Sequence, residues 1–170
     1  MTHADLIIRA AHWLRKTRRC RVVLTEISSQ ANEFPDAIGW SGGGATTLVE
    51  CKVSRDDFRA DLKKIFRQCP DRGMGNRRFY MVPPGLIYPG CLPEGWGLIE
   101  VSDKQVRVKV RSGVFHPVNT RAEMYVLISE LSLYQFVASG GELGPSARGS
   151  RIHHEMRRPP PVAPLHPGDT

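Results

Sequence analysis

Three side chains in residues 35–52 have the types and spacing of a hydrolytic metal site. Asp36 follows a proline that fixes the chain direction, and Glu50 and Lys52 stand two residues apart in an otherwise apolar run. Because side chains alternate along a strand, Glu50 and Lys52 are expected on one face. The opposite face is expected to lie in an apolar layer and to carry Val49, Cys51 and Val53. Burying a carboxylate and an ammonium costs several kcal/mol unless they are paired or bind a ligand.

Two carboxylates with an open side suit a hard cation, either Mg²⁺ or Mn²⁺. Such a cation takes one or two carboxylates, several waters and phosphate oxygens, so Asp36 and Glu50 are the expected metal ligands. The backbone carbonyl of Cys51 is a further candidate ligand. A metal here would lower the pKa of a bound water and stabilise charge on a phosphate. Lys52 could position that water or stabilise the pentavalent phosphorus.

The same spacing has a simpler interpretation. Glu50 and Lys52 could form an exposed ion pair on one face of an edge strand. Exposed pairs of this kind are common and contribute only about 0–1 kcal/mol. The Glu-X-Lys spacing alone therefore leaves both interpretations open.

The elements that would hold these side chains follow from the hydropathy pattern, which predicts a mixed α/β sandwich around a central sheet. Helices are expected over residues 3–18, 55–68 and 120–138. Strands are expected over residues 20–27, 36–40, 46–53, 78–82, 97–101 and 105–110. A glycine-rich turn at residues 41–44 predicts a hairpin, in which Asp36 can reach the Glu50 end of the next strand.

The expected helix over residues 55–68 begins directly after the site strand. Ser54 is a good N-cap, and early acidic residues such as Asp57 suit the positive end of the helix dipole. Asp61 lies one turn further on the same face. We expect it to pair with an arginine or lysine or to help orient the site.

Length and charge limit the possible functions. The 170 residues suit one domain, expected over residues 1–138, followed by a Pro/Gly/Arg/His-rich tail over residues 139–170 that we expect to be mostly disordered. The net charge of +7 favours a polyanionic partner such as nucleic acid. Five cations fall within seven positions: Arg15, Lys16, Arg18, Arg19 and Arg21. They could be a solvated helix C-terminus, a phosphate-contacting patch, or both.

Several other classes of protein are not indicated. No apolar run approaches the roughly 20 residues that span a membrane, and a secretion signal is absent, so a cytoplasmic location is expected. The four cysteines are scattered and are expected to be free thiols. No phosphate-loop or GxSxG motif occurs. His153 and His154 are expected to be surface residues, and His12 is expected at the surface or at the edge of the core.

At these residues the chain resembles the PD-(D/E)XK nuclease superfamily, whose signature is Pro-Asp followed by Asp/Glu-X-Lys on the next strand. Here the signature is Pro35-Asp36 and Glu50-Cys51-Lys52, and the resemblance covers about residues 3–101. Within the superfamily the chain looks most like the MmcB-like DNA-repair group. That group has a Val-Glu-x-Lys strand and a Ser-x-x-Asp-Phe-x-x-Asp-x-Lys helix start, which residues 49–63 match.

The resemblance implies a restriction-endonuclease-like core and a Mg²⁺- or Mn²⁺-dependent nuclease that cleaves DNA, with RNA and branched repair intermediates still open. It implies catalytic roles for Asp36, Glu50 and Lys52. It also implies an additional acidic residue, for which Glu26 is the first candidate and Glu33 the second; Glu26 could equally be an exposed strand-end charge. The expected nucleic-acid contacts are Arg15, Lys16, Arg18, Arg19 and Lys63. The alternative is a catalytically silent nuclease-like domain that binds nucleic acid or a protein. DNA repair and mobile-element or phage biology both remain open, and the sequence is compatible with a homodimer.

Overall fold

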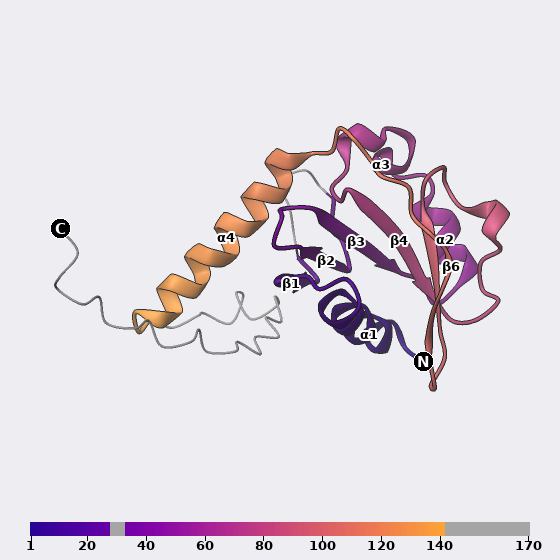
Figure 1. The fold of residues 1–170 in the computed structure, drawn as a ribbon, viewed down its shortest axis with the longest axis horizontal. Helices are drawn as coiled ribbons and strands as arrows, with labels where there is room; N and C mark the ends of the chain where they lie inside the picture. Colours follow the sequence, from indigo (N-terminus) through magenta and orange to yellow (C-terminus); the bar gives the residue numbers. More distant parts are fainter. Residues whose placement is uncertain (28–32, 142–170) are drawn as a thin grey trace, which may run out of the picture.

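The computed structural model describes residues 1–27 and 33–141, which form a six-stranded mixed sheet with helices on both faces (Figure 1). The predicted α/β architecture with a mixed central sheet flanked by helices is confirmed. The strands lie in the sheet in chain order: β1 (Val22–Thr25), β2 (Ala37–Trp40), β3 (Thr46–Cys51), β4 (Arg77–Val82), β5 (Gly97–Val101) and β6 (Val106–Val110).

The direction of the strands changes across the sheet. β2 is antiparallel to both of its neighbours, β1 and β3; β3, β4 and β5 run parallel, and β6 returns antiparallel to β5. The predicted hairpin of β2 and β3 is confirmed, with Ala37 opposite Val49. Its turn contains Gly44 at φ +83°, a left-handed conformation in which a side chain would be strained. The hairpin register sets the geometry of the predicted site.

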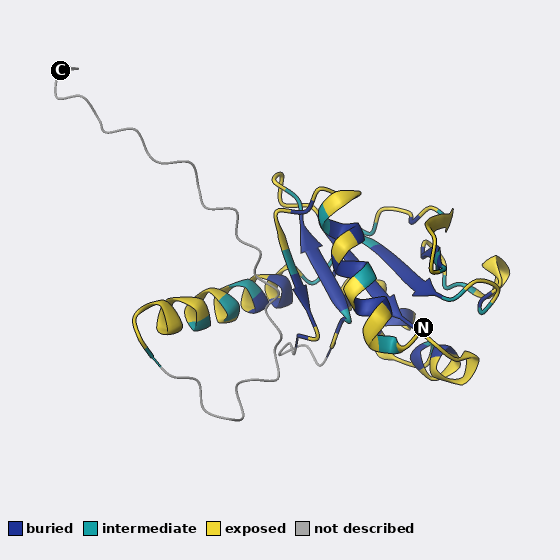
Figure 2. Ribbon diagram, turned by 90° about the horizontal axis from the view of Figure 1, so that it is seen from below, coloured by how far each residue is buried: buried dark blue, intermediate teal, exposed yellow. Residues whose placement is uncertain are grey.

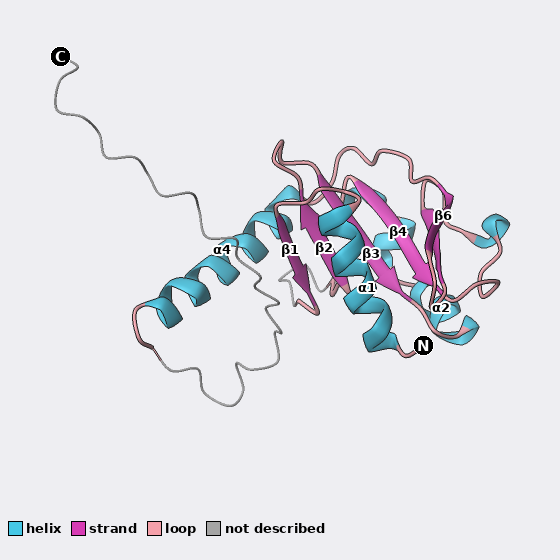
Figure 3. Cartoon of the chain, turned by 60° about the horizontal axis from the view of Figure 1, so that its bottom comes forward, coloured by secondary structure: helices cyan, strands magenta, loops and turns pink. Residues whose placement is uncertain are grey.

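One face of the sheet is covered by α1 (His3–Lys16), which crosses the strands in Figure 3. Thr2 and Asp5 form a capping box at its start, which satisfies backbone donors that the first turn leaves free. The helix buries one stripe of apolar side chains against the sheet: Leu6, Ile7, Ala10, Trp13 and Leu14. The helix ends two residues earlier than predicted, with Thr17 as its C-cap, and Arg19 then takes a left-handed φ of 56°.

The other face carries α2 (Arg55–Asp61), α3 (Ile65–Gln68) and the first turns of α4 (Thr120–Ala138). The prediction of one helix over residues 55–68 is wrong. Lys64 adopts an extended conformation with ψ 142°, so the helix stops and restarts at α3. Two short 3₁₀ turns, Pro70–Arg72 and Pro89–Cys91, lie in the connections before and after β4.

The last helix, α4, has the predicted bounds but an unexpected position. Only its first turns pack on the sheet, and the rest projects away from the body of the protein (Figure 1). Figure 2 shows most of the sheet as buried and most of α4 as exposed, although the edge strand β6 is itself largely exposed. The described helices include none that is long and apolar enough to cross a membrane.

The remaining sequence predictions differ from the structure in detail. β1 is two residues shorter at each end than predicted and β3 ends two residues earlier. β2, β4 and β6 each differ by one residue at their start, and β5 has the predicted bounds. Val53 lies beyond the end of β3 and is exposed, so its predicted place in the apolar layer is wrong. All four cysteines are free. Most of the predicted tail, including His153 and His154, lies outside the described residues.

Candidate active site at the ends of β1, β2 and β3

Three acidic residues lie in one row across the ends of β1, β2 and β3. The β1–β2 register ends at Thr25 opposite Ala37, and the Glu26 N–H then donates to the carbonyl of Asp36 at 3.1 Å. Continuing the β2–β3 register by one pair past Ala37 and Val49 sets Asp36 opposite Glu50. The hairpin therefore brings the two predicted metal ligands onto adjacent strands, as the sequence predicted.

Glu50 is a buried carboxylate held between two cations. It is only 1% exposed, Lys52 Nζ lies 3.3 Å from its Oε2, and Arg67 Nη2 lies 3.1 Å from its Oε1. Burial raises the pKa of Glu50 to about 7; Arg67 opposes this rise, and the negative charges of Asp36 and Asp61 add to it. The carboxylate is thus destabilised in its charged form, and an added cation would relieve that cost.

Lys52 lies on the same face of the chain as Glu50, as alternation predicted. Its ammonium is also 3.6 Å from Asp61 and 3.9 Å from Asp57. Burial acts to lower the pKa of Lys52, but the surrounding carboxylates, Glu50 first, outweigh it and raise the pKa. Lys52 is therefore a cation at neutral pH. In this form it can stabilise negative charge.

The interpretation of Glu50 and Lys52 as an exposed pair on an edge strand is wrong. β3 lies between β2 and β4, so it is an interior strand. Both side chains are buried, with Lys52 5% exposed. A buried pair on an interior strand must be compensated by further charges or ligands.

Asp36 sits at the edge of this buried cluster and is half-buried. Its Oδ2 accepts a 2.7 Å hydrogen bond from the Cys51 N–H, and its Oδ1 lies 3.4 Å from Nε2 of His3, at the start of α1. The N–H and C=O of a strand residue point toward the same neighbouring strand, so the Cys51 carbonyl faces the Asp36 side of β3. The Asp36 side chain therefore accepts a hydrogen bond from β3 just beyond the point where the β2–β3 ladder ends.

A second set of buried charges supports this row, and its centre, Arg67, was not predicted from the sequence. The guanidinium of Arg67 contacts three carboxylates: Asp61 at 2.7 Å, Glu33 at 3.2 Å and Glu50 at 3.1 Å. Tyr80, which pairs with Glu50 in the β3–β4 register, donates its hydroxyl to Asp61 Oδ2 at 2.6 Å. Arg67 also stacks over the Trp96 ring, 4.5 Å from its centroid. In this buried cluster each carboxylate therefore lies next to at least one cationic side chain.

The break between α2 and α3 explains why Arg67 was missed. In one continuous helix, residues 61 and 67 would lie about 120° apart around the axis and could not form a short pair. The extended conformation at Lys64 turns the chain so that Arg67 and Asp61 meet. Asp61 itself meets the expectation that it pairs with arginine or lysine, since it contacts Arg67, Lys64 and Lys52. Side chains that meet on a helix are three or four residues apart, so a spacing of six residues did not predict this contact.

The two candidates for an additional acidic residue have different surroundings. Glu26 is in the row, but it is exposed and its backbone has a left-handed φ of 52°. Glu33 is buried, pairs with Arg67, and accepts a 2.7 Å hydrogen bond from the Met74 N–H. Glu33 therefore holds the interior network together, whereas the side chain of Glu26 is open to solvent.

The residues present suit a Mg²⁺ site of the water-rich kind. The described residues contain no group of three or more His, Cys, Asp and Glu side chains arranged as a ready-made cage. Mg²⁺ commonly uses only one or two carboxylates, which Asp36 and Glu50 supply. Glu50 Oε1 has an ion-pair partner in Arg67 but no hydrogen bond among the described residues, so it retains lone pairs for another ligand. The donor set therefore fits a cation that keeps most of its waters.

The predicted phosphate contacts fall into two groups. Lys63 is exposed and lies two residues after Asp61, which is 3.6 Å from Lys52. The other group, Arg15, Lys16, Arg18 and Arg19, lies at the C-terminal end of α1. His3, which contacts Asp36, is at the opposite end of this helix, about 20 Å away along its axis. The basic group is therefore not part of the acidic row and could contact only a more distant part of a long ligand.

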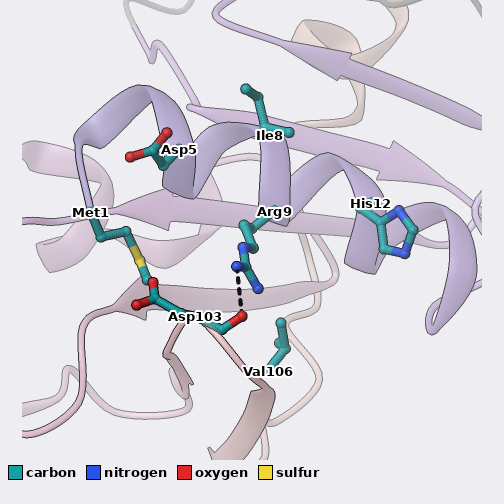
Figure 4. A pocket seen from close by; sticks show the side chains of 7 residues that line it. All are labelled: Met1, Asp5, Ile8, Arg9, His12, Asp103 and Val106. Atoms are coloured by element: carbon teal, nitrogen blue, oxygen red, sulfur yellow. Dashed lines mark hydrogen bonds between the residues drawn. The ribbon is translucent and has the colours of Figure 1, made fainter.

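Two surface hollows lie away from the acidic row. One, of about 600 Å³, lies between α1 and the β5–β6 turn, where Arg9 donates to the Asp103 carbonyl at 3.2 Å (Figure 4). Exposed His12 lines it, in keeping with the surface position predicted for this residue. The other, of about 590 Å³, lies near the β2–β3 turn and the start of α4. Neither hollow is lined by Asp36, Glu50 or Lys52.

No protein-family model and no curated protein matches the sequence. A solved structure of a protein of unknown function from Silicibacter pomeroyi is similar, with a TM-score of 0.62 and 20% sequence identity. The match covers 85% of this chain and 97% of that one. At this identity the similarity concerns the fold, and it extends over nearly the whole of the other protein.

Proposed function

We propose that the protein is a metal-dependent nuclease that hydrolyses DNA phosphodiester bonds. The observation that carries the proposal is the hairpin register, which sets Asp36 opposite Glu50 while Lys52 Nζ lies 3.3 Å from Glu50. Two adjacent carboxylates and a buried ammonium are the side chains that this chemistry requires. The resemblance to the PD-(D/E)XK superfamily, including its restriction-endonuclease-like core, supports the same assignment.

In this proposal each side chain has a separate task. Asp36, Glu50 and the Cys51 carbonyl would hold Mg²⁺ or Mn²⁺. The cation would supply Lewis-acid stabilisation of the phosphate and lower the pKa of water. Lys52, kept protonated by the carboxylates around it, stabilises the charge that develops on the phosphate oxygens. Arg67 and Asp61 fix Glu50 and Lys52 in place through their ion pairs.

The net charge of +7 supports a polyanionic substrate. Lys63, which is exposed and two residues from Asp61, is the proposed contact to a phosphate near the reacting bond. The basic end of α1 would contact backbone phosphates about 20 Å away, roughly six base pairs along B-DNA. A role in DNA repair or in mobile-element or phage biology, in the cytoplasm, would be consistent with this activity.

The test is cleavage of plasmid and oligonucleotide DNA with Mg²⁺ or Mn²⁺. We expect cleavage by the wild type and a loss of at least about 100-fold in Asp36→Asn and Lys52→Gln, because each removes a charge needed in the transition state. Asp56→Asn and Lys104→Gln are matched controls at exposed positions and are expected to retain activity. Full activity in the Asp36 and Lys52 variants would exclude this site.

A specific observation also favours a second candidate, a catalytically silent domain that binds nucleic acid or a protein. Glu50 is already neutralised by Lys52 and Arg67. Such a domain would bind DNA without added metal and cleave neither DNA, RNA nor branched substrates. Calorimetry with Mn²⁺ alone separates the two candidates, because only the nuclease should bind the ion with an affinity that falls in Asp36→Asn.

A further inference from the structure

α4 exposes an unusual amount of apolar surface. After its first two turns the helix leaves the sheet, and Figure 2 shows that most of its length is exposed. Seven large apolar side chains on this helix are between 39% and 56% exposed: Met124, Tyr125, Ile128, Leu131, Tyr134, Phe136 and Val137. Single exposed apolar residues are common on protein surfaces, but a contiguous patch marks a site of interaction.

The exposed part of α4 is apolar around its whole circumference. Residues 124–138 contain one charged residue, Glu130, and no lysine or arginine. Met124, Ile128 and Leu131 follow a spacing of four and three residues, the pattern of a helix-pairing seam. Tyr125, Tyr134 and Phe136 widen that seam on its flanks. A helix that is apolar on all sides is normally buried, so this segment has the composition of an interior helix.

We propose that α4 pairs with α4 of a second copy of this chain, forming a two-fold symmetric dimer. The area supports this occupant. Side chains of this size that are about half exposed offer roughly 100 Å² each, so the four within about 120° of the helix circumference, Met124, Ile128, Leu131 and Tyr134, offer about 400 Å² to a facing helix. Tyr125 and Phe136 on one flank raise this to about 600 Å², against about 800 Å² per partner in a standard interface. A two-fold contact uses the same patch on both copies, so one apolar helix supplies both sides.

Charge also favours a second copy. Two identical helices with a single glutamate each, in the middle of a largely neutral surface, meet with little repulsion. A helix that lies on a membrane surface typically carries lysines and arginines on its polar face, and residues 124–138 have none.

The dimer would leave the acidic row accessible. α4 begins next to the start of β3, where Glu123 accepts a 2.9 Å hydrogen bond from the Thr46 hydroxyl. The acidic row lies at the other end of β3, at Glu50, about 13 Å along the strand. From its start α4 projects outward, as Figure 1 shows, so pairing would occur away from Asp36 and Lys52.

The test is the mass of the full chain by sedimentation velocity and light scattering from about 1 to about 100 µM, the range in which a micromolar dimer dissociates. We expect the wild type to be a dimer at the upper concentration and the double variant Ile128→Glu/Leu131→Glu to be a monomer. Ile8→Glu is the matched control, because Ile8 is equally exposed on α1, and this variant should remain a dimer.

Circular dichroism and thermal unfolding will show whether each variant is folded. If the double glutamate variant misfolds, the milder Ile128→Gln/Leu131→Gln variant replaces it, and we expect its dimer to dissociate at least tenfold more readily. A wild type that is monomeric at about 100 µM would overturn the proposal. So would a dimer that persists in folded α4 variants, or a monomer that binds neutral lipid vesicles through α4. None of these results depends on DNA cleavage.

Discussion

The acidic row and α4 depart from the usual pattern of burial in opposite ways. At the end of β3 charged side chains are buried, with Glu50, Lys52, Asp61 and Arg67 all below one-tenth exposed. On α4 apolar side chains such as Ile128 and Leu131 are about half exposed. Either arrangement is unfavourable unless something compensates for it. The charges at the end of β3 are compensated by ion pairs and hydrogen bonds within the described residues, whereas the same part of the chain leaves large apolar side chains of α4 exposed.

The difference affects what each region can do. A buried network of charges is held rigidly, because every member has a defined partner at a short distance. Rigid placement suits chemistry, in which groups must be positioned within fractions of an ångström. An exposed apolar helix suits association, since its free energy comes from covering area rather than from one geometry. Mutations should therefore affect stability strongly in the buried charge network around Glu50 and Arg67 and weakly on the outer side of α4.

The largest effect is expected for Arg67→Met. Removing the guanidinium leaves Glu33, Glu50 and Asp61 buried without their shared cation, which should lower the free energy of unfolding by about 3–5 kcal/mol. Arg59→Met is the control, because Arg59 and Asp56 form an exposed pair, whose loss should cost less than about 1 kcal/mol. Urea unfolding measures both. Equal losses in the two variants would mean that the buried network contributes no more than a surface pair.

The next effect concerns the pH dependence of stability, measured without divalent cations. The folded pKa of Glu50 is raised to about 7 from 4.5, so the unfolded chain releases its proton first as the pH rises. The stability of the wild type relative to Glu50→Gln is therefore highest below pH 4.5 and falls as the pH rises toward 7, by up to about 3 kcal/mol. Denaturant unfolding at several pH values measures this difference. A difference that is constant with pH would show that Glu50 is not held in its neutral form.

A smaller effect is expected within α4, where the inner and outer sides can be compared directly. Val126 is buried against the sheet, so Val126→Ala should cost about 2 kcal/mol from lost burial and a residual cavity. Ile128→Ala removes an exposed side chain and should cost less than about 0.5 kcal/mol in the monomer. Unfolding at low protein concentration measures both. A large loss in the Ile128 variant under these conditions would show that the outer side of α4 is covered within the monomer.

The smallest effect is expected for Tyr80→Phe, which removes the hydroxyl that donates to Asp61 at 2.6 Å. Arg67 and Lys64 still satisfy Asp61, so the loss should be about 1–2 kcal/mol. Tyr88→Phe is the matched control at an exposed position and should leave stability unchanged. Thermal unfolding of the two variants compares them. A neutral Tyr80→Phe would mean that the two cations alone hold Asp61.

Much of the fold could be predicted from local sequence. The order of helices and strands, the β2–β3 hairpin, and the bounds of β5 and α4 follow from hydropathy period and turn residues, which act over a few positions. The alternation that sets Glu50 and Lys52 on one face is also local, and the structure has the two side chains 3.3 Å apart. The break at Lys64 was not predicted, because the apolar period continues through it. The contacts that follow the break include ones distant in sequence, such as those of Arg67 with Glu33 and Glu50.

For the site, the sequence by itself determined which residue types stand at Asp36, Glu50 and Lys52, and which strand holds the last two. Tertiary structure alone decided that these strands are interior, that Arg67 and Tyr80 complete the charge network, and that α4 leaves the sheet. The physical reason is the sequence distance over which each effect acts. Alternation and capping depend on neighbours in the chain, whereas burial and the compensation of a charge depend on whatever the fold brings within about 4 Å.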